Sequence, residues 1–477
     1  MVVTTPGGNN APNTLYTYVG VTIVVSPGTD IQAAEALTTS RQFAASGGVG
    51  PYTYSTTSTL PAGLVLTAGG LLSGRPTANS AGSYNVTIRA TDANGSLGFV
   101  SFTITVGARP DPTKDTSVIG IQNSQLAASK RFSGMQSDAA LARLDGSRAC
   151  LKNTLNITPQ GALVPTNAPT AGTPVAPGAG GNNLLASNAM TSVPQEPKEG
   201  NETICGDWAA WGSAGIDYGS NGDNHYRFNM PSATLGIDYR ANAALVVGVA
   251  FGYGTDRSKI NDGLARSNSR FWSGMAYGGL KLTDILFLDA VVGYSDGQFD
   301  TTRNIVDEGL TFKGNRSGKQ FFGKARLSGT QEVSTFKVMP FASVEYGSGS
   351  LNGYTETGDA MLALAYDKGH FDYTTAAAGI KVSRVVKADN GIFEPSIRFQ
   401  QRYTGNSNVN QTLYYADLPA TKYNLYTDPF SRNQSAADVG VVFRSKSGVS
   451  AGIGFGVLTG SQNLVERSGN VRLAVPF

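Results

Sequence analysis

Apolar residues alternate with small or polar residues through the second half of the chain, over residues 207–477. One representative segment places Val247, Val249 and Phe251 on one face, with glycine and alanine on the other. Side chains two positions apart in a β-strand point to the same side of the sheet, so such segments predict strands with two chemically different faces. The repetition of this pattern restricts this half of the chain to a large β-sheet.

The polar face of these predicted strands carries charge, which favours a membrane barrel over a soluble sandwich. In residues 393–400, for example, Glu394 and Arg398 alternate with phenylalanine and isoleucine. A sandwich packs its apolar faces against each other, whereas a barrel hydrates charged side chains in its lumen and exposes apolar ones to lipid. Short and long connections alternate between the segments, as periplasmic turns and external loops do in bacterial barrels.

We therefore predict an all-β fold whose C-terminal domain, residues 206–477, is a transmembrane antiparallel β-barrel of about 12 strands. The apolar runs are too short for a spanning helix, and a lipid environment requires that every strand edge be paired. The lipid bilayer of the outer membrane is the first expected partner. The strands are expected to begin near residues 207, 226, 243, 268, 285, 318, 336, 360, 391, 433, 449 and 465.

Residues 15–107 have a different organisation, with short β-prone runs separated by glycine, proline, asparagine and serine. This pattern predicts a β-sandwich. The segments LPAGL (60–64), LLSGRPT (71–77), AGSY (81–84) and ATDANG (90–95) resemble the immunoglobulin-like repeats of bacterial surface proteins, in the cadherin-like superfamily. The resemblance implies an immunoglobulin-like (Ig-like) domain with an adhesive or spacer role, towards a host or surface ligand that the sequence leaves unknown.

Asp92 and Asn94 have two interpretations within this domain. Cadherin-like sandwiches bind calcium through carboxylates between domains, so the resemblance implies a candidate calcium site at Asp92 and Asn94. Asp30 and Asp111 are the distant acidic residues that could complete it. The same pair fits an Asx-type turn that needs no metal, and this is the interpretation we favour.

Residues 108–205 are expected to connect the two domains. Val118, Ile121, Phe132 and Leu144 recur at approximately helical spacing, which predicts a helix over residues 117–148. A helix of this length is roughly 40 Å long, enough to cross an outer membrane. A linker rich in proline, glycine and alanine follows over residues 150–204.

Several segments resemble the autotransporter β-domain family of type V secretion. They include Trp208 with Trp211, residues 286–290 (LFLDA), residues 354–358 (YTETG) and the helical pattern within residues 125–144. The resemblance implies an outer-membrane translocator whose helix threads the pore and whose Ig-like passenger is displayed at the cell surface. The long linker departs from family members in which the helix enters the barrel directly, so the sequence leaves open which segment lies in the pore.

The last strand carries a further expectation. Val471, Leu473, Val475 and Phe477 alternate up to a terminal aromatic residue. This pattern resembles the signal that the outer-membrane assembly machinery reads, so we expect that machinery to be a partner.

Two cysteines, Cys150 and Cys205, bracket the linker. In an oxidising compartment they could form a disulfide that closes one large loop, and the alternative is two free thiols.

Composition bears on other classes of function. Only 15% of the residues are charged and the net charge of +3 is spread along the chain, so we expect no nucleic-acid partner. The two histidines, His225 and His370, lie beside predicted loops without a Gly-x-Ser-x-Gly elbow or a metal-binding pattern. We expect no enzymatic activity and no required cofactor.

The chief alternative is an outer-membrane porin or channel whose Ig-like domain stays in the periplasm. The same barrel pattern would serve it, and free flow of ions through the barrel would favour it. The first residues, MVVTTPGGNN, have neither the basic nor the apolar region of an export signal, so we expect export to depend on a signal upstream of this sequence.

Overall fold

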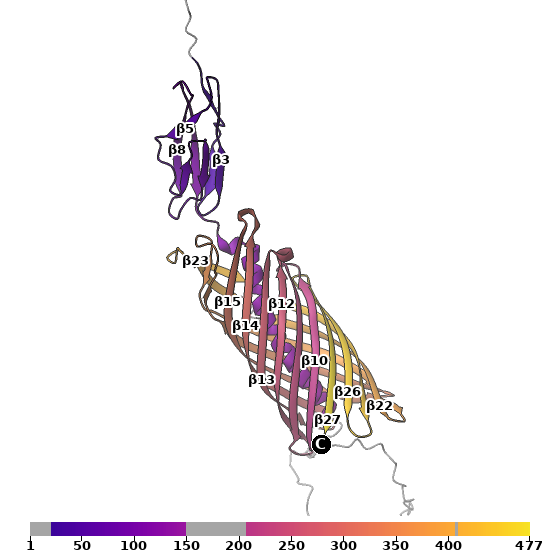
Figure 1. Ribbon diagram of the computed structural model, residues 1–477. Helices are drawn as coiled ribbons and strands as arrows, with labels where there is room; N and C mark the ends of the chain where they lie inside the picture. Colours follow the sequence, from indigo (N-terminus) through magenta and orange to yellow (C-terminus); the bar gives the residue numbers. More distant parts are fainter. Residues whose placement is uncertain (1–20, 149–206, 406–408) are drawn as a thin grey trace, which may run out of the picture.

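The computed structural model describes residues 21–148, 207–405 and 409–477. Within these segments the chain forms a small sandwich, one long helix and a closed barrel that surrounds the helix (Figure 1). The predicted all-β fold with a sandwich, a helical connector and a C-terminal barrel is confirmed.

The sandwich consists of short strands around one apolar core. Strand β2 runs parallel to β9, and β8 pairs with both β9 and β5 to complete a four-stranded sheet. A three-stranded sheet, β3-β7-β6, covers its other side, and Phe43 from one sheet stacks on Phe102 from the other at 5.3 Å between ring centroids. The strands are β1 (Val24–Ser26), β2 (Ile31–Ala34), β3 (Thr39–Gln42), β4 (Ala44–Ser46), β5 (Thr53–Thr56), β6 (Leu64–Leu66), β7 (Leu71–Gly74), β8 (Gly82–Thr91) and β9 (Leu97–Gly107).

A short 3-10 helix, η1 (Pro112–Lys114), leads from the sandwich into the long helix α1 (Thr116–Ser147). Asp115 caps α1, because its carboxylate accepts a hydrogen bond from the backbone N–H of Ser117 at 2.7 Å. None of the helices in the described segments is both long and apolar enough to cross a membrane.

Twelve long strands form the barrel, as the sequence predicts. Each strand pairs antiparallel with its neighbours, and pairing of β10 with β27 closes the sheet, with Trp211 opposite Ala474. Two short strands, β16 (Gln331–Val333) and β21 (Val386–Ala388), extend hairpins at the end that carries Trp208 and Phe477. The twelve are β10 (Trp208–Asn221), β11 (Tyr226–Arg240), β12 (Leu245–Ile260), β13 (Ala265–Lys281), β14 (Leu286–Ile305), β15 (Leu310–Gly329), β17 (Phe336–Leu351), β20 (Gly369–Arg384), β22 (Gly391–Gly405), β25 (Asn433–Ser445), β26 (Ser450–Gly460) and β27 (Leu464–Pro476).

The two faces of the strands are the predicted ones. Val249 and Phe251 on β12 are 58% and 55% exposed on the outer surface, whereas Ala250 between them is 8% exposed and faces the lumen. The barrel therefore presents apolar side chains outward over much of its height, as a lipid-facing surface requires.

Two expected strand starts are wrong. The strand predicted to begin near residue 318 begins eight residues earlier, at Leu310. The strand predicted to begin near residue 360 begins at Gly369, because Leu362 and Leu364 are buried in a cluster outside the barrel wall. There the loops form a separate four-stranded sheet that lies over one side of the barrel mouth. Its strands are β18 (Tyr354–Thr355), β19 (Leu364–Tyr366), β23 (Val409–Tyr415) and β24 (Tyr423–Thr427).

Candidate functional site

Helix α1 occupies the barrel lumen along its length (Figure 1). It packs against the wall formed by β10 to β15, and its apolar residues Phe132 and Leu144 are 0% and 2% exposed. Phe132 stacks on Phe271 of β13 at 5.1 Å between ring centroids. Of the segments that the structure describes, α1 is therefore the one in the pore, a point that the sequence left open.

Glycines in the wall allow this close approach. A Cβ atom on Gly254 of β12 would lie 3.0 Å from the ring of Phe132, and one on Gly252 would overlap the side chain of Gln136. The small lumen-facing residues of β12 thus form the surface into which the helix fits.

Polar residues on α1 meet polar residues of the wall near the helix start. Arg316 of β15 donates from Nη2 to Oε1 of Gln122 at 2.6 Å and from Nε to Oε1 of Gln125 at 2.7 Å. Among the described residues no carboxylate lies within ion-pair distance of Arg316, so amide oxygens of the helix solvate this buried guanidinium.

The middle of the helix carries two buried cations. Arg131 pairs with Asp256 of β12 at 3.1 Å and lies over the ring of Phe228, 3.3 Å from its centroid. Lys130 donates to the hydroxyl of Thr404 at 3.0 Å and lies 5.2 Å from the ring centroid of Tyr373. Both faces of the helix are thus fixed to the wall.

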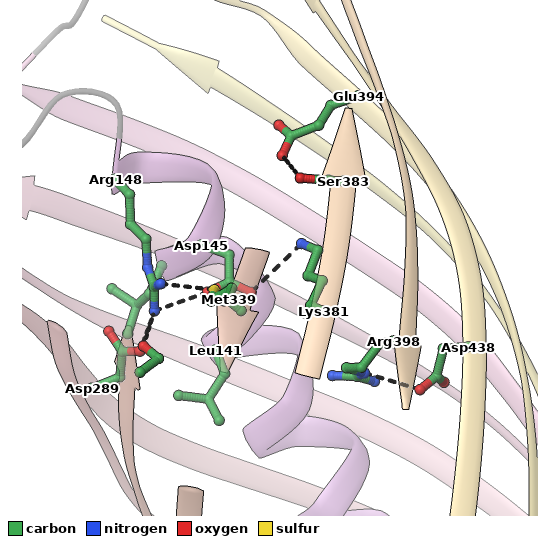
Figure 2. Close-up of polar contacts among 12 residues, drawn as sticks. Leu141, Asp145, Arg148, Asp289, Met339, Lys381, Ser383, Glu394, Arg398 and Asp438 are labelled. Atoms are coloured by element: carbon green, nitrogen blue, oxygen red, sulfur yellow. Dashed lines mark hydrogen bonds and ion pairs between the residues drawn. The ribbon is translucent and has the colours of Figure 1, made fainter. Parts of the chain in front are cut away.

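Two arginines and two aspartates join the end of the helix to the wall, and Figure 2 shows Arg148 with Asp145 and Asp289. Arg148 contacts Asp289 of β14 at 2.8 Å and Asp145 of the helix at 3.1 Å. Arg326 of β15 contacts the same two carboxylates, at 2.8 Å to Asp289 and 2.6 Å to Asp145. Shared carboxylates compensate the buried guanidinium groups and give the helix a defined depth in the pore.

About one turn nearer the start of α1, Arg143 forms a second buried pair with Asp238 of β11. Asp238 also accepts a hydrogen bond from the hydroxyl of Tyr277 at 3.1 Å, and Trp211 donates from Nε1 to that hydroxyl oxygen at 2.6 Å. Three strands therefore hold the carboxylate that the helix arginine contacts.

The helix does not fill the lumen. A cavity of about 290 Å³ lies between α1 and the opposite wall, and the helix side of it is lined by small residues such as Gly134 and Ala139 and by charged ones such as Asp138. A smaller space of about 80 Å³ continues towards the end of the helix, beside Arg148. Charged side chains of both signs line the cavity wall, such as Arg398 and Asp438, which pair at 2.9 Å (Figure 2).

The sandwich contacts the barrel loops through an ion pair at its base. Arg75 donates to both carboxylate oxygens of Asp359, at 2.6 and 3.1 Å. The hydrogen bonds from Arg75 hold the pKa of Asp359 below its usual range. Beside this pair, Ala36 of the sandwich packs into the apolar cluster that contains Leu362.

A second ion pair anchors the segment between the sandwich and the helix. Arg109 contacts Asp417 at 2.5 Å and lies 5.0 Å from the ring centroid of Tyr415. Only 2% of the Arg109 side chain is exposed, against 23% for Arg75. Asp417, in contrast, is 33% exposed and Asp359 is 21% exposed. The two pairs fix the sandwich at the mouth of the barrel.

The residues expected to form the assembly signal lie together on the outer surface of β27. Val471, Leu473, Val475 and Phe477 are 53%, 53%, 40% and 66% exposed. Their strand pairs with β10, and the backbones of Phe477 and Trp208 exchange hydrogen bonds at 2.9 and 3.2 Å.

The carboxylate of Asp92 accepts hydrogen bonds from backbone N–H groups of Val49, Asn94 and Ser96 at 3.0, 3.0 and 2.6 Å. The bond to Asn94 is that of an Asx turn, and the bond from Val49 leads the contributions that lower the pKa of Asp92. The described part of the chain holds no group of three or more His, Cys, Asp or Glu residues placed to bind a metal.

The structure does not bring the remaining residues singled out from the sequence together at one site. Cys150 and Cys205 lie outside the described residues. His225 lies in the turn between β10 and β11, and His370 lies on the outer face of β20.

The charged contacts of the helix were not identified from the sequence as a site. Asp145, Arg148, Asp238 and Arg326 are separated by long stretches of chain, and no spacing rule links them. Charge at a lumen-facing position such as Asp289 is not by itself a signal, because a barrel lumen can hydrate charged side chains; the helix that buries Asp289 is what makes a partner necessary.

Comparison with known proteins gives two matches on separate parts of the chain. Residues 208–456 match the family described as the autotransporter beta-domain, and residues 4–107 match the family described as "Putative Ig domain". The first match spans just over half of the 477 residues.

Individual relatives are distant. Outer membrane protein A of Rickettsia conorii is 22% identical over 317 residues, which cover 62% of this chain and 16% of that protein. Esterase EstA of Pseudomonas aeruginosa is 26% identical over 240 residues, which cover 46% of this chain and 36% of that protein. The chain thus spans well under two thirds of the length of either relative.

Among solved structures, the translocator domain of the autotransporter NalP from Neisseria meningitidis is similar, with a TM-score of 0.45 and 16% identity. That similarity covers 57% of this chain and 89% of the NalP structure. The family match over residues 208–456 coincides with the closed barrel that surrounds α1, and the chain belongs to the autotransporter beta-domain family.

Proposed function

We propose that this chain is an outer-membrane autotransporter translocator that anchors and displays its own Ig-like domain at the cell surface. The observation that carries the proposal is the path of the chain. The sandwich lies at one mouth of the barrel, α1 descends through the lumen, and Trp208 begins the barrel at the other mouth (Figure 1). A chain with this path connects the two sides of the membrane in which the barrel resides.

The orientation follows from the barrel ends. In bacterial barrels the short turns and the ends of the barrel chain lie on the periplasmic side. The mouth beside Trp208 and Phe477 has these properties, and the longer loops, including residues 352–368, lie at the mouth that contacts the sandwich. We assign the sandwich to the external side on this basis.

An adhesive or spacer role suits the sandwich. The ion pairs of Arg75 and Arg109 hold its base against the barrel loops, so its far end projects from the membrane. Any ligand would bind at the exposed strand edges or loops of that far end. We also propose that the assembly machinery reads the outward residues of β27.

We propose that the chain itself is not catalytic. EstA is named as an esterase, but this chain covers 36% of it. Among the described residues, neither His225 nor His370 belongs to a group of three or more His, Cys, Asp or Glu side chains placed to bind a metal, and the charged contacts of α1 with the wall join the helix to the barrel.

Protease shaving of intact Gram-negative cells tests the proposal. The chain would be expressed behind a signal peptide with one tag before the sandwich and another in the turn at residues 385–390. We expect external protease to remove the first tag and spare the second until the outer membrane is permeabilised. Protection of both tags in intact cells would reject display and leave the channel with a periplasmic Ig-like domain.

A charge-reversed variant sharpens this test. Asp238→Arg places a like charge opposite Arg143 in the lumen, and we expect less of the first tag at the surface while the barrel still folds. The matched control, Asp262→Arg, changes an exposed loop carboxylate that is 91% accessible, and display should be unaffected.

A further inference from the structure

A belt of exposed aromatic residues marks the outer membrane boundary on the barrel wall. Members of the belt are 40% to 52% exposed and lie on β10, β12, β13, β14, β15 and β17, with none on β11: Tyr218, Tyr253, Trp272, Tyr294, Phe321 and Tyr346. Aromatic residues of transmembrane barrels gather at the level of the lipid headgroups. Each member of the belt lies eight to ten residues along its strand from the end at the Trp208 mouth. That is roughly 20–25 Å of height in a tilted strand, about the thickness of the apolar band of such a barrel, so the belt marks the outer leaflet in the orientation proposed above.

Beyond this belt the outward face of β11 to β13 is cationic. Arg257 and Lys259 lie four and six residues beyond Tyr253 on the same face of β12, roughly 13 and 20 Å along the strand. Arg270 and Arg266 lie two and six residues beyond Trp272 on β13. We name Arg227, Arg257, Lys259, Arg266 and Arg270 the cationic patch.

Like charges are direct neighbours within the cationic patch. Lys259 lies opposite Arg227 on one side and opposite Arg266 on the other, so three adjacent strands present three cations in one row. Directly opposed side chains in a sheet are about 5 Å apart at Cβ, and like charges there repel. Such a row attracts anions, because a bound anion relieves the repulsion between the cations.

The chain supplies little of that compensation. Arg227 pairs with Asp262 at 3.1 Å, with both side chains mostly exposed, and Arg270 lies 3.4 Å from Asp300. Among the described residues, no carboxylate lies within ion-pair distance of Arg257, Lys259 or Arg266. The centre of the cationic patch therefore has unpaired charge.

The opposite wall of the barrel lacks this feature. Beyond the apolar surface, the outward residues of β20, β22, β25 and β26 are neutral or acidic in the described chain, for example Asp372, Tyr403, Ser435 and Thr459. Elsewhere on the outer rim, the exposed cations of the described strands stand singly. Lys319 of β15 lies opposite Asp296 of β14. Arg467 of β27 lies opposite Tyr218 of β10. The cationic patch differs because its cations lie directly opposite one another.

We propose that the cationic patch binds the phosphate groups of the phosphorylated glycolipid that forms the outer leaflet of the outer membrane. Arginine and lysine recognise phosphate through charge-assisted hydrogen bonds. Arg270 lies at headgroup level beside the aromatic belt, whereas Arg257, Lys259 and Arg266 lie farther out. A phospholipid headgroup is too shallow to reach all of them, so the depth of the patch fits a lipid with phosphates on an extended sugar core.

Binding by the purified full chain tests this inference. The probe is lipopolysaccharide with a phosphorylated inner core, titrated against the chain in non-ionic detergent, with retained glycolipid measured by native mass spectrometry. The triple variant Arg257→Gln, Lys259→Gln, Arg266→Gln is expected to bind on the order of a hundredfold more weakly, at about fivefold per charge. Equal binding by this variant would overturn the proposal.

A matched control removes the same charge at the other end of the barrel. Arg384, Lys387 and Lys446 are exposed near the opposite mouth, and their replacement by glutamine should leave binding unchanged. An equal loss in this control would mean that net charge, rather than the cationic patch, determines binding, and would reject the proposal.

Three further probes distinguish the phosphate of the glycolipid from phosphate of other sources. Dephosphorylated lipopolysaccharide and phosphatidylglycerol vesicles should bind weakly, and inorganic phosphate at millimolar concentration should not displace the glycolipid. Displacement by inorganic phosphate, or equal binding of either lipid, would contradict the proposed glycolipid site.

A charge-conserving variant covers the case in which the triple variant does not fold. Arg257→Lys with Arg266→Lys keeps the charge and should retain binding within about threefold, since the patch attracts phosphate mainly as point charges. A loss as large as that expected for the triple variant would overturn the proposal. This inference rests on the proposed function only for which side of the barrel faces the outer leaflet. A negative result in the binding assay with purified protein would reject the glycolipid site and would leave surface display untouched.

Discussion

Arg143 of the lumen helix and Asp238 of the barrel wall form a two-pronged ion pair, with Nε–Oδ2 and Nη2–Oδ1 distances of 2.7 and 2.8 Å. Their side chains are 13% and 5% exposed. Removal of one partner from a buried pair leaves an uncompensated charge, which costs more than the pair itself contributes.

We therefore expect Arg143→Ala to lower the free energy of unfolding by about 3–5 kcal/mol, since Asp238 would remain buried without its cation. Urea unfolding of the purified barrel, followed by tryptophan fluorescence, measures the change. Arg227→Ala is the matched control, because Arg227 and Asp262 are 76% and 91% exposed, and we expect a change below about 1 kcal/mol. Similar losses in both variants would contradict a specific role for the buried pair.

The fit of the helix against β12 gives a second prediction. Gly252→Val introduces carbon where Gln136 lies, so we expect the helix to shift, with a loss of about 1–3 kcal/mol in stability and a higher single-channel conductance. Gly274→Val is the control, since a Cβ at Gly274 meets nothing within 4 Å. If the conductance of Gly252→Val in planar bilayers is unchanged, the helix has kept its position and the barrel wall has moved to accommodate the valine, which would contradict the prediction.

The contact between the sandwich and the barrel should weaken at low pH, because protonation of Asp359 removes its ion pair with Arg75. Arg75 lowers the pKa of this carboxyl in the docked state, so the contribution of the pair is present above the ordinary pKa of about 4 and is lost as pH falls through the lowered value. The side chains are 23% and 21% exposed, so solvent limits the contribution to below about 1 kcal/mol.

Energy transfer between one label on the sandwich and one on the barrel lip measures this dependence. We expect a constant distance distribution from pH 7 to about pH 5 and a broader one below about pH 4. In Arg75→Ala the distribution should already be broad at neutral pH. A response near pH 6 instead would exclude Asp359 as the titrating group.

The two cysteines carry a chemical prediction. If Cys150 and Cys205 form the expected disulfide, alkylation of the exported chain without reductant should add no label, and alkylation after reduction should add two. Mass spectrometry counts the labels directly. Two labels without reductant would favour free thiols.

Variants of the outward residues of β27 test whether these residues act as an assembly signal or only as part of the lipid-facing surface. Replacement of Leu473 and Phe477 by serine should lower the amount of folded barrel in cells, while refolding of the purified chain in detergent stays close to wild type. Heat-modifiable mobility in gels measures both. An equal defect in detergent would mean that these side chains act only through contact with the apolar phase.

The sequence determined the elements of this protein because the necessary information is local. A period of two places Val249 and Phe251 outward whatever their neighbours are, and helical spacing brings Val118, Ile121 and Phe132 to buried positions. The number of long strands and the presence of a sandwich follow from such repeats and from the turns between them.

The tertiary structure decided which elements meet. Leu362 and Leu364 alternate like barrel residues, but they are buried in the loop cluster, and the strand begins later, at Gly369. The pairs of Arg143 with Asp238 and of Arg148 with Asp289 join residues far apart in the chain. Their energies depend on desolvation and on exact geometry inside the lumen, and neither property can be read from the order of residues along the chain.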